Sequence, residues 1–249
     1  SGKTTIAEEV GKYLALRGYE SVHIPFDIFL KDKSWRSGME KLILGEPLTP
    51  VERRAVGEPG CHIEPTTTYY GEEAFWDIEA REALVRKIEE FRGSGREETT
   101  LVVPGGYDRG TKGRRDYEFH LRRGSIIIID GKYCNREELA SCYDLCYRLV
   151  DNPERTKAKF EMRTRSLSPN TADSQMRFYG VGLIPSYERY AERTSEVVDW
   201  TIDLYGDEWK LVNGHPSLAQ VAPCGRSGRE PGPRPPVLRR RPNAGRRSD

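Results

Sequence analysis

Features that mark membrane and secreted proteins are scarce or missing in this 249-residue sequence. No apolar run approaches the ~20 residues needed to cross a bilayer, which excludes a membrane-spanning protein. The first residues show no basic segment followed by an apolar one, so secretion has no support. The five cysteines are an odd number without a CxxC pair, which argues against a disulfide framework and fits a reducing compartment. We therefore expect a cytoplasmic protein with no membrane partner.

The sequence also has no large excess of positive or negative charge, because the net charges of two regions cancel each other. The 40 basic and 39 acidic residues give a net charge of +1. Residues 223–249 hold eight arginines against two acidic residues, or +6, whereas residues 1–222 hold 32 basic and 37 acidic residues, or −5. The composition of Pro, Gly and Arg predicts disorder in this tail. A basic arm could bind nucleic acid non-specifically, but without aromatic residues for stacking we favour a terminal extension with no specific nucleic-acid partner.

Helix and strand patterns alternate along residues 1–222. The helices predicted from apolar residues at helical spacing cover 3–17, which Gly18 ends, 37–44, 72–91, 153–165 and 185–198. The strands predicted from apolar and β-branched runs cover 21–26, 99–103, 125–129, 145–150 and 200–204. The run at 125–129 is typical of a central parallel strand buried on both faces. The alternation indicates an α/β fold, a parallel sheet with helices on both faces, in one domain over 1–222 followed by the basic tail over 223–249.

The chain opens with the second half of the phosphate-binding pattern GxxxxGK[ST]. Backbone N–H groups at a helix N-terminus form a cradle for anions, where Lys3 would reach the β- and γ-phosphates and the Thr4 hydroxyl would bind Mg²⁺. The alternative is a chance Gly-Lys-Thr-Thr at the start of a helix, and the amphipathic helix that follows favours the phosphate site. We predict a site for ATP and Mg²⁺ at Ser1, Gly2, Lys3, Thr4 and Thr5.

This interpretation places the start of the chain inside the motif. The first glycine of the pattern and the strand that feeds the loop would lie before Ser1. We therefore expect the first strand of the sheet and half of the phosphate loop to be missing from this chain. That strand would be central in the sheet, so its absence should leave a slot between its neighbours and weaken the binding of ATP.

Carboxylates follow two of the predicted strands, at the point where each strand ends. Asp27 follows the strand at 21–26, and Asp130 follows the strand at 125–129. Open α/β sheets bind their ligands at the carboxyl ends of the strands, so both side chains are expected at one edge, together with Tyr107 and Asp108 after the strand at 99–103. Asp130 would hold Mg²⁺ together with Thr4. Asp27 would accept the proton of an attacking hydroxyl as a general base.

Both carboxylates also have a structural interpretation. Asp130 could begin a turn with Gly131, although its pairing with a phosphate-binding Lys3 favours the metal site. Asp27 could cap a helix that begins at Ile28, and we favour the general base over the cap.

Two basic segments complete the set of candidate residues. Tyr107 and Asp108 follow the strand at 99–103 and lead into a basic loop with Arg109, Lys112, Arg114 and Arg115. The helix at 153–165 carries basic residues near one face, followed by one more: Arg155, Lys159, Arg163 and Arg165. Arginines on a mobile lid can neutralise the charge of a transferred phosphoryl group, and we select Arg163 and Arg165 for that role. The alternative is a solvated basic face balanced by glutamates.

The cysteines and histidines do not predict a metal site. Three clustered cysteines lack a matching histidine pair, so we interpret them as buried structural thiols: Cys134, Cys142 and Cys146. His23 lies within a predicted strand and is expected in the core, and His120 is expected in a loop or at an element terminus.

The motifs, in their order and at their spacings, resemble the uridine kinase and phosphoribulokinase family of P-loop small-molecule kinases. The matching segments are SGKTT at 1–5, FDIF at 26–29, AFWD at 74–77, PGGYD at 104–108, IIIIDG at 126–131 and RTR at 163–165. The resemblance covers about residues 1–204 and implies a fold like that of P-loop nucleoside triphosphate hydrolases. It implies that Asp27 is the catalytic aspartate, that Asp130 is the magnesium-associated acid, and that Tyr107 contacts the substrate. It also implies that Arg163 and Arg165 are lid arginines.

Two departures from the family bear on the substrate. Nucleoside kinases of this group carry an Asp-His pair shortly before their Ala-Phe-Asp, where this chain has Tyr70 and Gly71. They also carry a histidine five residues after the tyrosine of their Tyr-Asp pair, where this chain has Lys112. Those positions read the sugar and the base, so the sequence does not favour uridine. We predict that Tyr107, Asp108 and Lys112 bind the substrate, and the basic loop fits an anionic one.

These observations predict an ATP-dependent kinase that transfers the γ-phosphoryl group to a hydroxyl of a small metabolite, such as a nucleoside or a sugar phosphate. One alternative is a nucleotide kinase that phosphorylates a phosphate group and needs no general base. Another is a nucleotide-binding regulator without phosphotransfer, which needs no carboxylate directed at an acceptor. The sequence leaves the oligomeric state open, a homo-oligomer included.

Overall fold

The computed structural model describes residues 2–57, 75–203 and 210–213. The helices are α1 (Lys3–Leu16), η1 (Phe26–Phe29), α2 (Lys33–Leu44), α3 (Pro50–Val56), α4 (Ile78–Gly93), α5 (Glu137–Ala140), α6 (Pro153–Thr164), α7 (Pro169–Phe178), η3 (Tyr179–Leu183) and α8 (Ile184–Arg193). The strands are β1 (Ser21–Pro25), β2 (Glu98–Asp108), β3 (Gly113–Arg122), β4 (Ile126–Asp130), β5 (Tyr147–Val150), β6 (Trp200–Asp203) and β7 (Lys210–Asn213). Ser1, Tyr70, Gly71 and the predicted tail over 223–249 lie outside the described residues.

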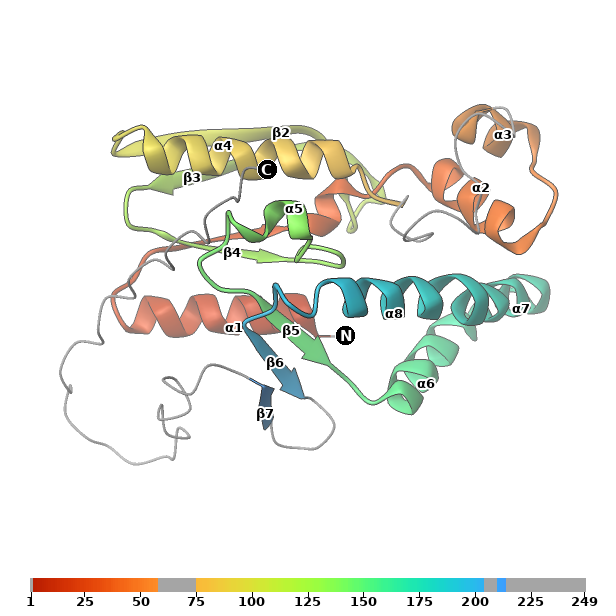
Figure 1. Cartoon of the computed structure of the whole chain (residues 1–249). Coiled ribbons are helices and arrows are strands. Elements are labelled where there is room, and N and C mark those ends of the chain that lie inside the picture. The colour runs from red at the N-terminus through yellow and green to blue at the C-terminus, as the bar shows by residue number, and fades with distance from the viewer. Residues whose placement is uncertain (1, 58–74, 204–209, 214–249) are drawn as a thin grey trace, which may run out of the picture.

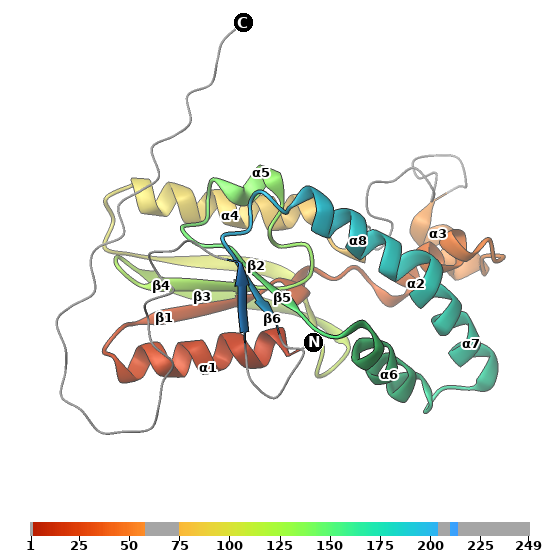
Figure 2. The ribbon, with the colours of Figure 1, turned by 60° about the horizontal axis from the view of Figure 1, so that its bottom comes forward.

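The molecule is layered, with helices on both faces of its strands (Figures 1 and 2). Helix α1 runs along one side of β1 and β4, and α4 and α5 lie on the other side. Helices α2, α3, α6, α7 and α8 lie together beyond the end of these strands. The predicted α/β class, with parallel strands and helices on both faces, is confirmed.

Parallel pairing occurs in two separate sheets. Strand β1 pairs with β4, in a register that sets Ser21 opposite Ile126 and Pro25 opposite Asp130. Strand β5 pairs in parallel with β6, which pairs antiparallel with β7. Within the described residues β4 has β1 as its single strand partner, and all five of its residues are half-buried. The prediction of a strand buried on both faces and central in the sheet is therefore wrong for the described residues.

Strands β2 and β3 form a long antiparallel hairpin, which the sequence patterns do not predict. The Pro-Gly-Gly segment at 104–106 suggested the end of a strand, but β2 continues through it with a register shift between Val103 and Gly106. The predicted basic loop at 109–115 is instead a short turn plus the start of β3. His120 lies within β3, not in a loop, and pairs with Thr100 of β2 at 2.9 Å.

Helix ends follow the local chemistry more closely than the apolar pattern. Helix α1 ends as predicted, because Gly18 adopts a left-handed conformation (φ +79°) that an L side chain rarely adopts. Helix α4 begins at Ile78 rather than at residue 72, because the Asp77 carboxylate caps it by accepting from the Ala80 N–H at 3.0 Å. Helix α8 ends at Arg193, five residues before the predicted end.

The core is built largely by α4 and the strands it covers. Leu84, Val85 and Ile88 face inward from α4 and are at most 6% exposed. They belong to one cluster with Ile24 of β1 and Leu121 of β3. Full burial of an aliphatic side chain contributes about 1.5–3 kcal/mol. This packing holds α4 against β2 and against η1, the short helix that follows β1.

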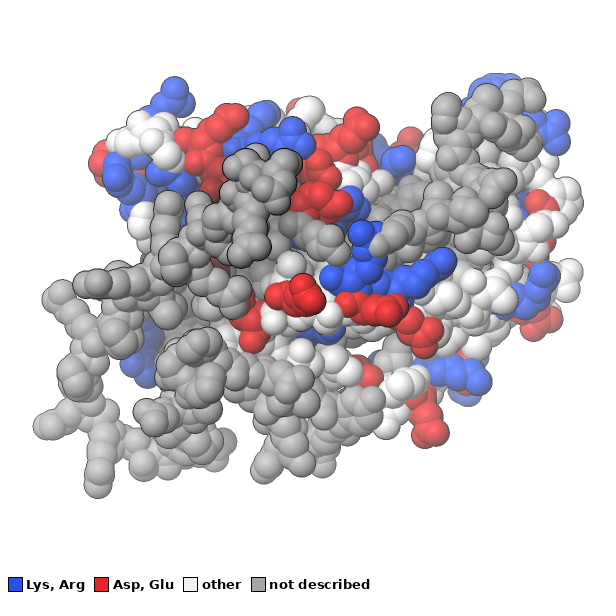
Figure 3. All heavy atoms as spheres, viewed as in Figure 1, with Lys and Arg blue, Asp and Glu red and all other residues white. Residues whose placement is uncertain are grey.

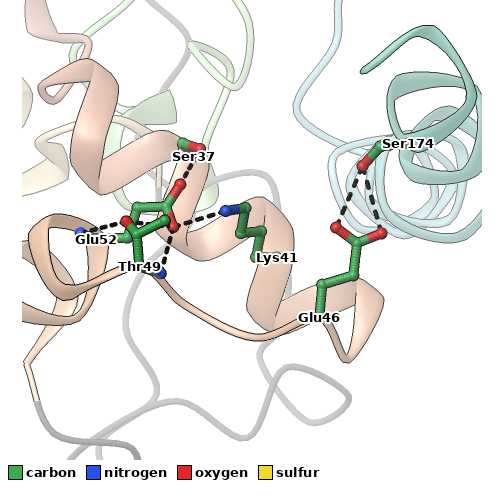
Figure 4. A network of polar contacts seen from close by, with 6 residues as sticks. All are labelled: Ser37, Lys41, Glu46, Thr49, Glu52 and Ser174. Carbon is green, nitrogen blue, oxygen red and sulfur yellow. Dashed lines mark hydrogen bonds and ion pairs between the residues drawn. The ribbon is translucent and has the colours of Figure 1, made fainter. Parts of the chain in front are cut away.

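Helices α2 and α3 are joined by a carboxylate held from several sides (Figure 4). Glu52 of α3 accepts from Ser37 at 2.6 Å and from Lys41 at 2.8 Å, both on α2. It also closes a capping box with Thr49. Beyond the end of α2, Glu46 accepts from Ser174 of α7 at 3.4 Å, which attaches α7 to this pair.

Figure 3 shows one face of the molecule, on which acidic and basic side chains are interspersed wherever grey atoms do not cover the surface. The described part of this face has no region of one charge sign. Among the described residues, no helix is both long enough and apolar enough to cross a bilayer.

Candidate active site

The pairing of β1 with β4 brings two segments far apart in the sequence to one edge. Because Pro25 lies opposite Asp130, the two strands end together. Asp27 follows two residues after Pro25, in the short helix η1. Helix α1 packs against both strands. The predicted convergence at the carboxyl ends of the strands therefore holds for Asp27 and Asp130.

Asp130 is the most firmly held side chain at this edge. Its Oδ2 accepts from the Thr4 hydroxyl at 2.9 Å, and its Oδ1 contacts His23 Nε2 at 2.6 Å. The Asp130 side chain is 10% exposed. Burial alone would raise the pKa of this carboxyl, but the contacts to His23 and Thr4 outweigh burial and lower it. We call Thr4, His23 and Asp130 the Asp130 group; its carboxylate is ionised at neutral pH.

The start of α1 lies beside this group. Gly2 is left-handed (φ 70°), and the helix has no side-chain cap and no acidic residue in its first turn. The first N–H groups of α1, which include that of Thr5, point out of the helix N-terminus. The helix dipole makes this end favourable for anions. Burial and the neighbouring charge of Lys132 lower the pKa of Lys3, and Asp27 and Asp130 act in the opposite direction.

Asp27 lies at the same edge and forms an ion pair with the turn between β2 and β3. Its Oδ2 lies 2.6 Å from Nη2 of Arg109, which comes from the turn between β2 and β3. The carboxylate is 21% exposed and the arginine 67%. The alternative role as a helix cap is wrong, because Pro25 occupies the N-cap position of η1 and no side chain caps that helix.

The predicted substrate residues Tyr107 and Asp108 are the last residues of β2, in the antiparallel β2–β3 hairpin, so the prediction that they follow the end of a parallel strand is wrong. Asp108 accepts from the Gly110 N–H at 2.9 Å and from Thr111 at 3.1 Å, and these bonds lower its pKa. The Tyr107 ring lies between the guanidinium groups of Arg36, at 4.9 Å, and Arg114, at 5.9 Å. Asp108 thus helps to shape the turn.

Lys112 lies in this turn with a left-handed backbone (φ 57°) and an exposed side chain. We call Arg109, Lys112, Arg114 and Arg115 the basic turn. Two further members pair with aspartates, Arg114 with Asp32 at 2.6 Å and Arg115 with Asp108 at 3.8 Å.

The predicted lid arginines are not joined to the site in this conformation. Arg163 is in the last turn of α6 and Arg165 follows it, and both side chains are exposed. No hydrogen bond or ion pair within the described part of the chain links either one to the Asp130 group. Their role at the phosphates stays a prediction.

Two contacts of the site were missed in the sequence. His23 was assigned to the core, but its partner Ile128 is two residues from Asp130, and residues two apart share a face of a strand. The parallel pairing of β1 with β4 would therefore have indicated the contact. Arg109 was read as part of a loop, and nothing in the linear sequence pairs it with Asp27.

The donors at the Asp130 group fit the predicted magnesium. A hydroxyl and a carboxylate oxygen 2.9 Å apart are hard oxygen ligands, which Mg²⁺ prefers. In residues 2–57, 75–203 and 210–213 there is no group of three or more His, Cys, Asp or Glu side chains that could hold a metal. Mg²⁺ is commonly held by one or two protein oxygens together with phosphate and water. The three described cysteines are free thiols; Cys146 is buried as predicted, whereas Cys134 and Cys142 are half-buried.

Comparisons with known proteins give structural neighbours only. No family model matches the chain, and no curated protein matches it. Among solved structures, a possible uridine kinase from Bacillus stearothermophilus is similar with a TM-score of 0.47 and 18% identity, covering 80% of this chain and 81% of that one. Phosphoribulokinase from Rhodobacter spheroides is similar with a TM-score of 0.48 and 14% identity, covering 82% and 67%. These names agree with the family that the motifs resemble.

Proposed function

We propose that this chain is an ATP-dependent kinase that transfers the γ-phosphoryl group to a hydroxyl of a small metabolite. The observation that carries this proposal is the contact of Thr4 with Asp130 at 2.9 Å across 126 positions of sequence. It joins a helix start suited to phosphates to a strand-end carboxylate suited to a metal. Asp27 adds a second carboxylate at the same edge.

On the nucleotide side, residues of α1 bind and orient. Lys3 and the N–H groups at the start of α1 hold the phosphate oxygens. Thr4 and Asp130 would hold Mg²⁺, which neutralises charge on the phosphates when bound. His23 keeps Asp130 turned so that its other oxygen faces Thr4. These residues supply position and charge, which is most of what phosphoryl transfer requires of a protein.

On the acceptor side, Asp27 is the general base. The acceptor oxygen forms its bond to the γ-phosphorus, the bond to the bridging oxygen of the nucleotide breaks, and the hydroxyl proton passes to an Asp27 oxygen. ADP leaves with the electron pair of the broken bond. Arg109 shares Asp27 with the acceptor, and its exposed side chain can move aside. Arg163 and Arg165 are proposed to neutralise the transferred group from the lid.

The basic turn supports an anionic acceptor, such as a sugar phosphate. Arg109 pairs with the proposed base Asp27, and Arg115 pairs with Asp108 at the end of β2, so this end of the hairpin carries cationic groups. Lys112 stands in the position where nucleoside kinases of the resembled family carry histidine. Together with Tyr107, these side chains would bind a charged group on the acceptor.

The test is ADP release by the purified protein with Mg²⁺ and ATP, with and without a panel of nucleosides and sugar phosphates. We expect release that depends on one class of acceptor. Lys3→Ala should abolish most of it, whereas Lys12→Ala on the exposed face of α1, where Lys12 pairs with Glu9, should not. Nucleotide binding without acceptor-dependent release would support the regulator instead, and release with nucleoside monophosphates alone would support the nucleotide kinase.

A further inference from the structure

A charged side chain is completely buried where the two strand ends meet. Arg81, in the first turn of α4, is 0% exposed and is the largest of the fully buried side chains. Its guanidinium bonds to backbone carbonyls: Nη1 donates to Lys132 O at 3.0 Å, and Nη2 donates to Phe26 O at 3.3 Å. Within the described residues its buried Nε has no hydrogen-bond partner.

This arrangement is costly for a core position. Burial lowers the pKa of Arg81 from 12.5 to about 10, so the group stays protonated at neutral pH. A buried charge held on neutral carbonyls is usually worse than an apolar side chain of similar volume. The rings of Phe26 and Trp76, each with its centroid 5.1 Å from the guanidinium carbon, offset part of that cost. Costly features of this kind concentrate at functional sites.

The two carbonyls belong to the two segments that carry the proposed chemistry. Phe26 directly precedes Asp27, and Lys132 lies two residues after Asp130. The same segments touch directly: a Cβ added at Gly131 would lie 2.7 Å from the Phe26 Cβ. The guanidinium therefore bridges two strand ends that have no room to approach further.

Helix α4 gives this bridge a fixed base. The Asp77 N–H donates to Phe29 O at 2.8 Å, which attaches the start of α4 to η1. On the other side, Tyr133 turns the chain back with a left-handed backbone (φ 58°), and its ring packs on Trp76 at 5.5 Å. Strain of this kind persists where the surroundings hold it in place.

We propose that Arg81 is a positioning residue of the kinase site: it fixes the separation of the Asp27 and Asp130 carboxylates by bridging the carbonyls of Phe26 and Lys132. The inference rests on the proposed function, because it assigns those carboxylates to the acceptor and to the metal. A planar guanidinium donates to two carbonyls at once, which an ammonium on a flexible stem does not reproduce. A misplacement of about 1 Å between reacting groups can lower the rate about 100-fold.

The test compares two substitutions with a control on the same helix. Arg81→Lys keeps the charge and loses the bridge, and Arg81→Met keeps most of the volume and loses both. Arg86→Met is the control, because Arg86 is 70% exposed and pairs with Glu82 one turn away. We expect kcat to fall about 10- to 100-fold in Arg81→Lys with the KM for ATP changed less than threefold, measured well below the melting temperature. The control should match the wild type in both constants.

A merely structural role predicts a different result. Arg81→Lys would then melt at a lower temperature while each folded molecule kept the wild-type kcat, and this would overturn the proposal. If Arg81→Met does not fold, Arg81→Lys decides. A wild type with no acceptor-dependent ADP release would contradict the proposed function rather than the bridge.

A crystal structure of Arg81→Lys tests the bridge without any measurement of activity. We expect the distance between the Cα atoms of Asp27 and Asp130 to change, or the segment after either strand to become disordered. An unchanged distance with both segments ordered would overturn the positioning role.

Discussion

The Asp130 group and the basic turn lie at the same edge of the molecule but are built in opposite ways. Asp130 is 10% exposed and has a partner on each carboxylate oxygen, from α1 and from β1. Arg109 of the basic turn is 67% exposed and reaches Asp27 through an ion pair. The first arrangement is fixed by burial and by three secondary-structure elements, whereas an exposed pair contributes only about 0–1 kcal/mol.

The difference indicates which half of the site is formed in advance. A magnesium–nucleotide complex presents the same phosphates each time, so a rigid set of donors suits it. An acceptor must enter and leave, so its binding residues can be exposed and paired only with one another. We infer a preformed nucleotide half and an adaptable acceptor half, with Arg81 between them.

The largest expected effect falls on the carboxylate that the two halves share. Asp27→Asn removes the proposed base and should lower kcat about 10²- to 10⁴-fold with a hydroxyl acceptor. Asp144→Asn is the matched control, because Asp144 is 76% exposed and pairs with Arg92 at 2.9 Å on the surface. Steady-state kinetics check this. Equal rates for Asp27→Asn and the wild type would remove the general base and favour phosphate as the acceptor group.

The fixed nucleotide half is tested by replacing His23, which contacts the Asp130 carboxylate. His23→Leu leaves Asp130 without its contact at Oδ1 and should raise the Mg²⁺ concentration for half-maximal rate about 10- to 100-fold. His120→Leu removes a histidine that pairs with Thr100 on the exposed hairpin, and it should leave that concentration unchanged. A magnesium titration of the initial rate measures both variants. The same magnesium requirement in His23→Leu would show that Asp130 needs no partner.

The adaptable acceptor half is tested by removing the exposed charge of Lys112. Lys112→Ala should raise the KM for a phosphorylated acceptor about fivefold or less and leave the KM for a neutral acceptor unchanged, because an exposed charge acts weakly through solvent. The KM effect should shrink as salt is added. If both KM values stay unchanged at low salt, the basic turn does not read the charge of the acceptor.

The smallest effect on turnover is expected at a carboxylate outside both halves. Burial alone would raise the pKa of Glu52, but hydrogen bonds from Lys41, Ser37 and Thr49 outweigh it and lower the pKa from 4.5 to about 2. Because the folded pKa lies below the unfolded one, this stabilisation is complete above pH 4.5 and is lost as the pH falls through about 2.

Glu52→Gln should therefore reduce the free energy of unfolding at pH 7 by about 1–3 kcal/mol and flatten its fall in acid, with kcat unchanged. Denaturant melts at pH 7 and pH 3 measure this. A variant that loses stability equally at both values would contradict the lowered pKa.

The parts of the fold that the sequence predicted are those with local signals. The β-branched run ending in Asp130 and the strand ending before Asp27 were found within one or two residues, and their parallel pairing follows from the alternation with helices. Gly18 marked the end of α1 because its left-handed conformation suits glycine. The contact of Thr4 with Asp130 was also expected, because both lie at the carboxyl edge of a parallel sheet.

The parts that were missed depend on contacts between distant segments. Residues 104–106 suggested a break, yet β2 accommodates them as an irregularity because β3 supplies hydrogen bonds on both sides. Arg81 belongs to a charged type that is almost never fully buried, so no sequence pattern places it in the core. Its partners are backbone carbonyls, which every residue carries, and only the packing of α4 selects them.

The most direct test of the account is the chemical form of the phosphorus product. The purified protein is incubated with Mg²⁺, ATP and the acceptor that supports ADP release, and the mixture is followed by ³¹P nuclear magnetic resonance. The account predicts a new phosphate monoester, formed in the same amount as ADP. Inorganic phosphate alone, or a new diphosphate in place of the monoester, would contradict transfer to a hydroxyl.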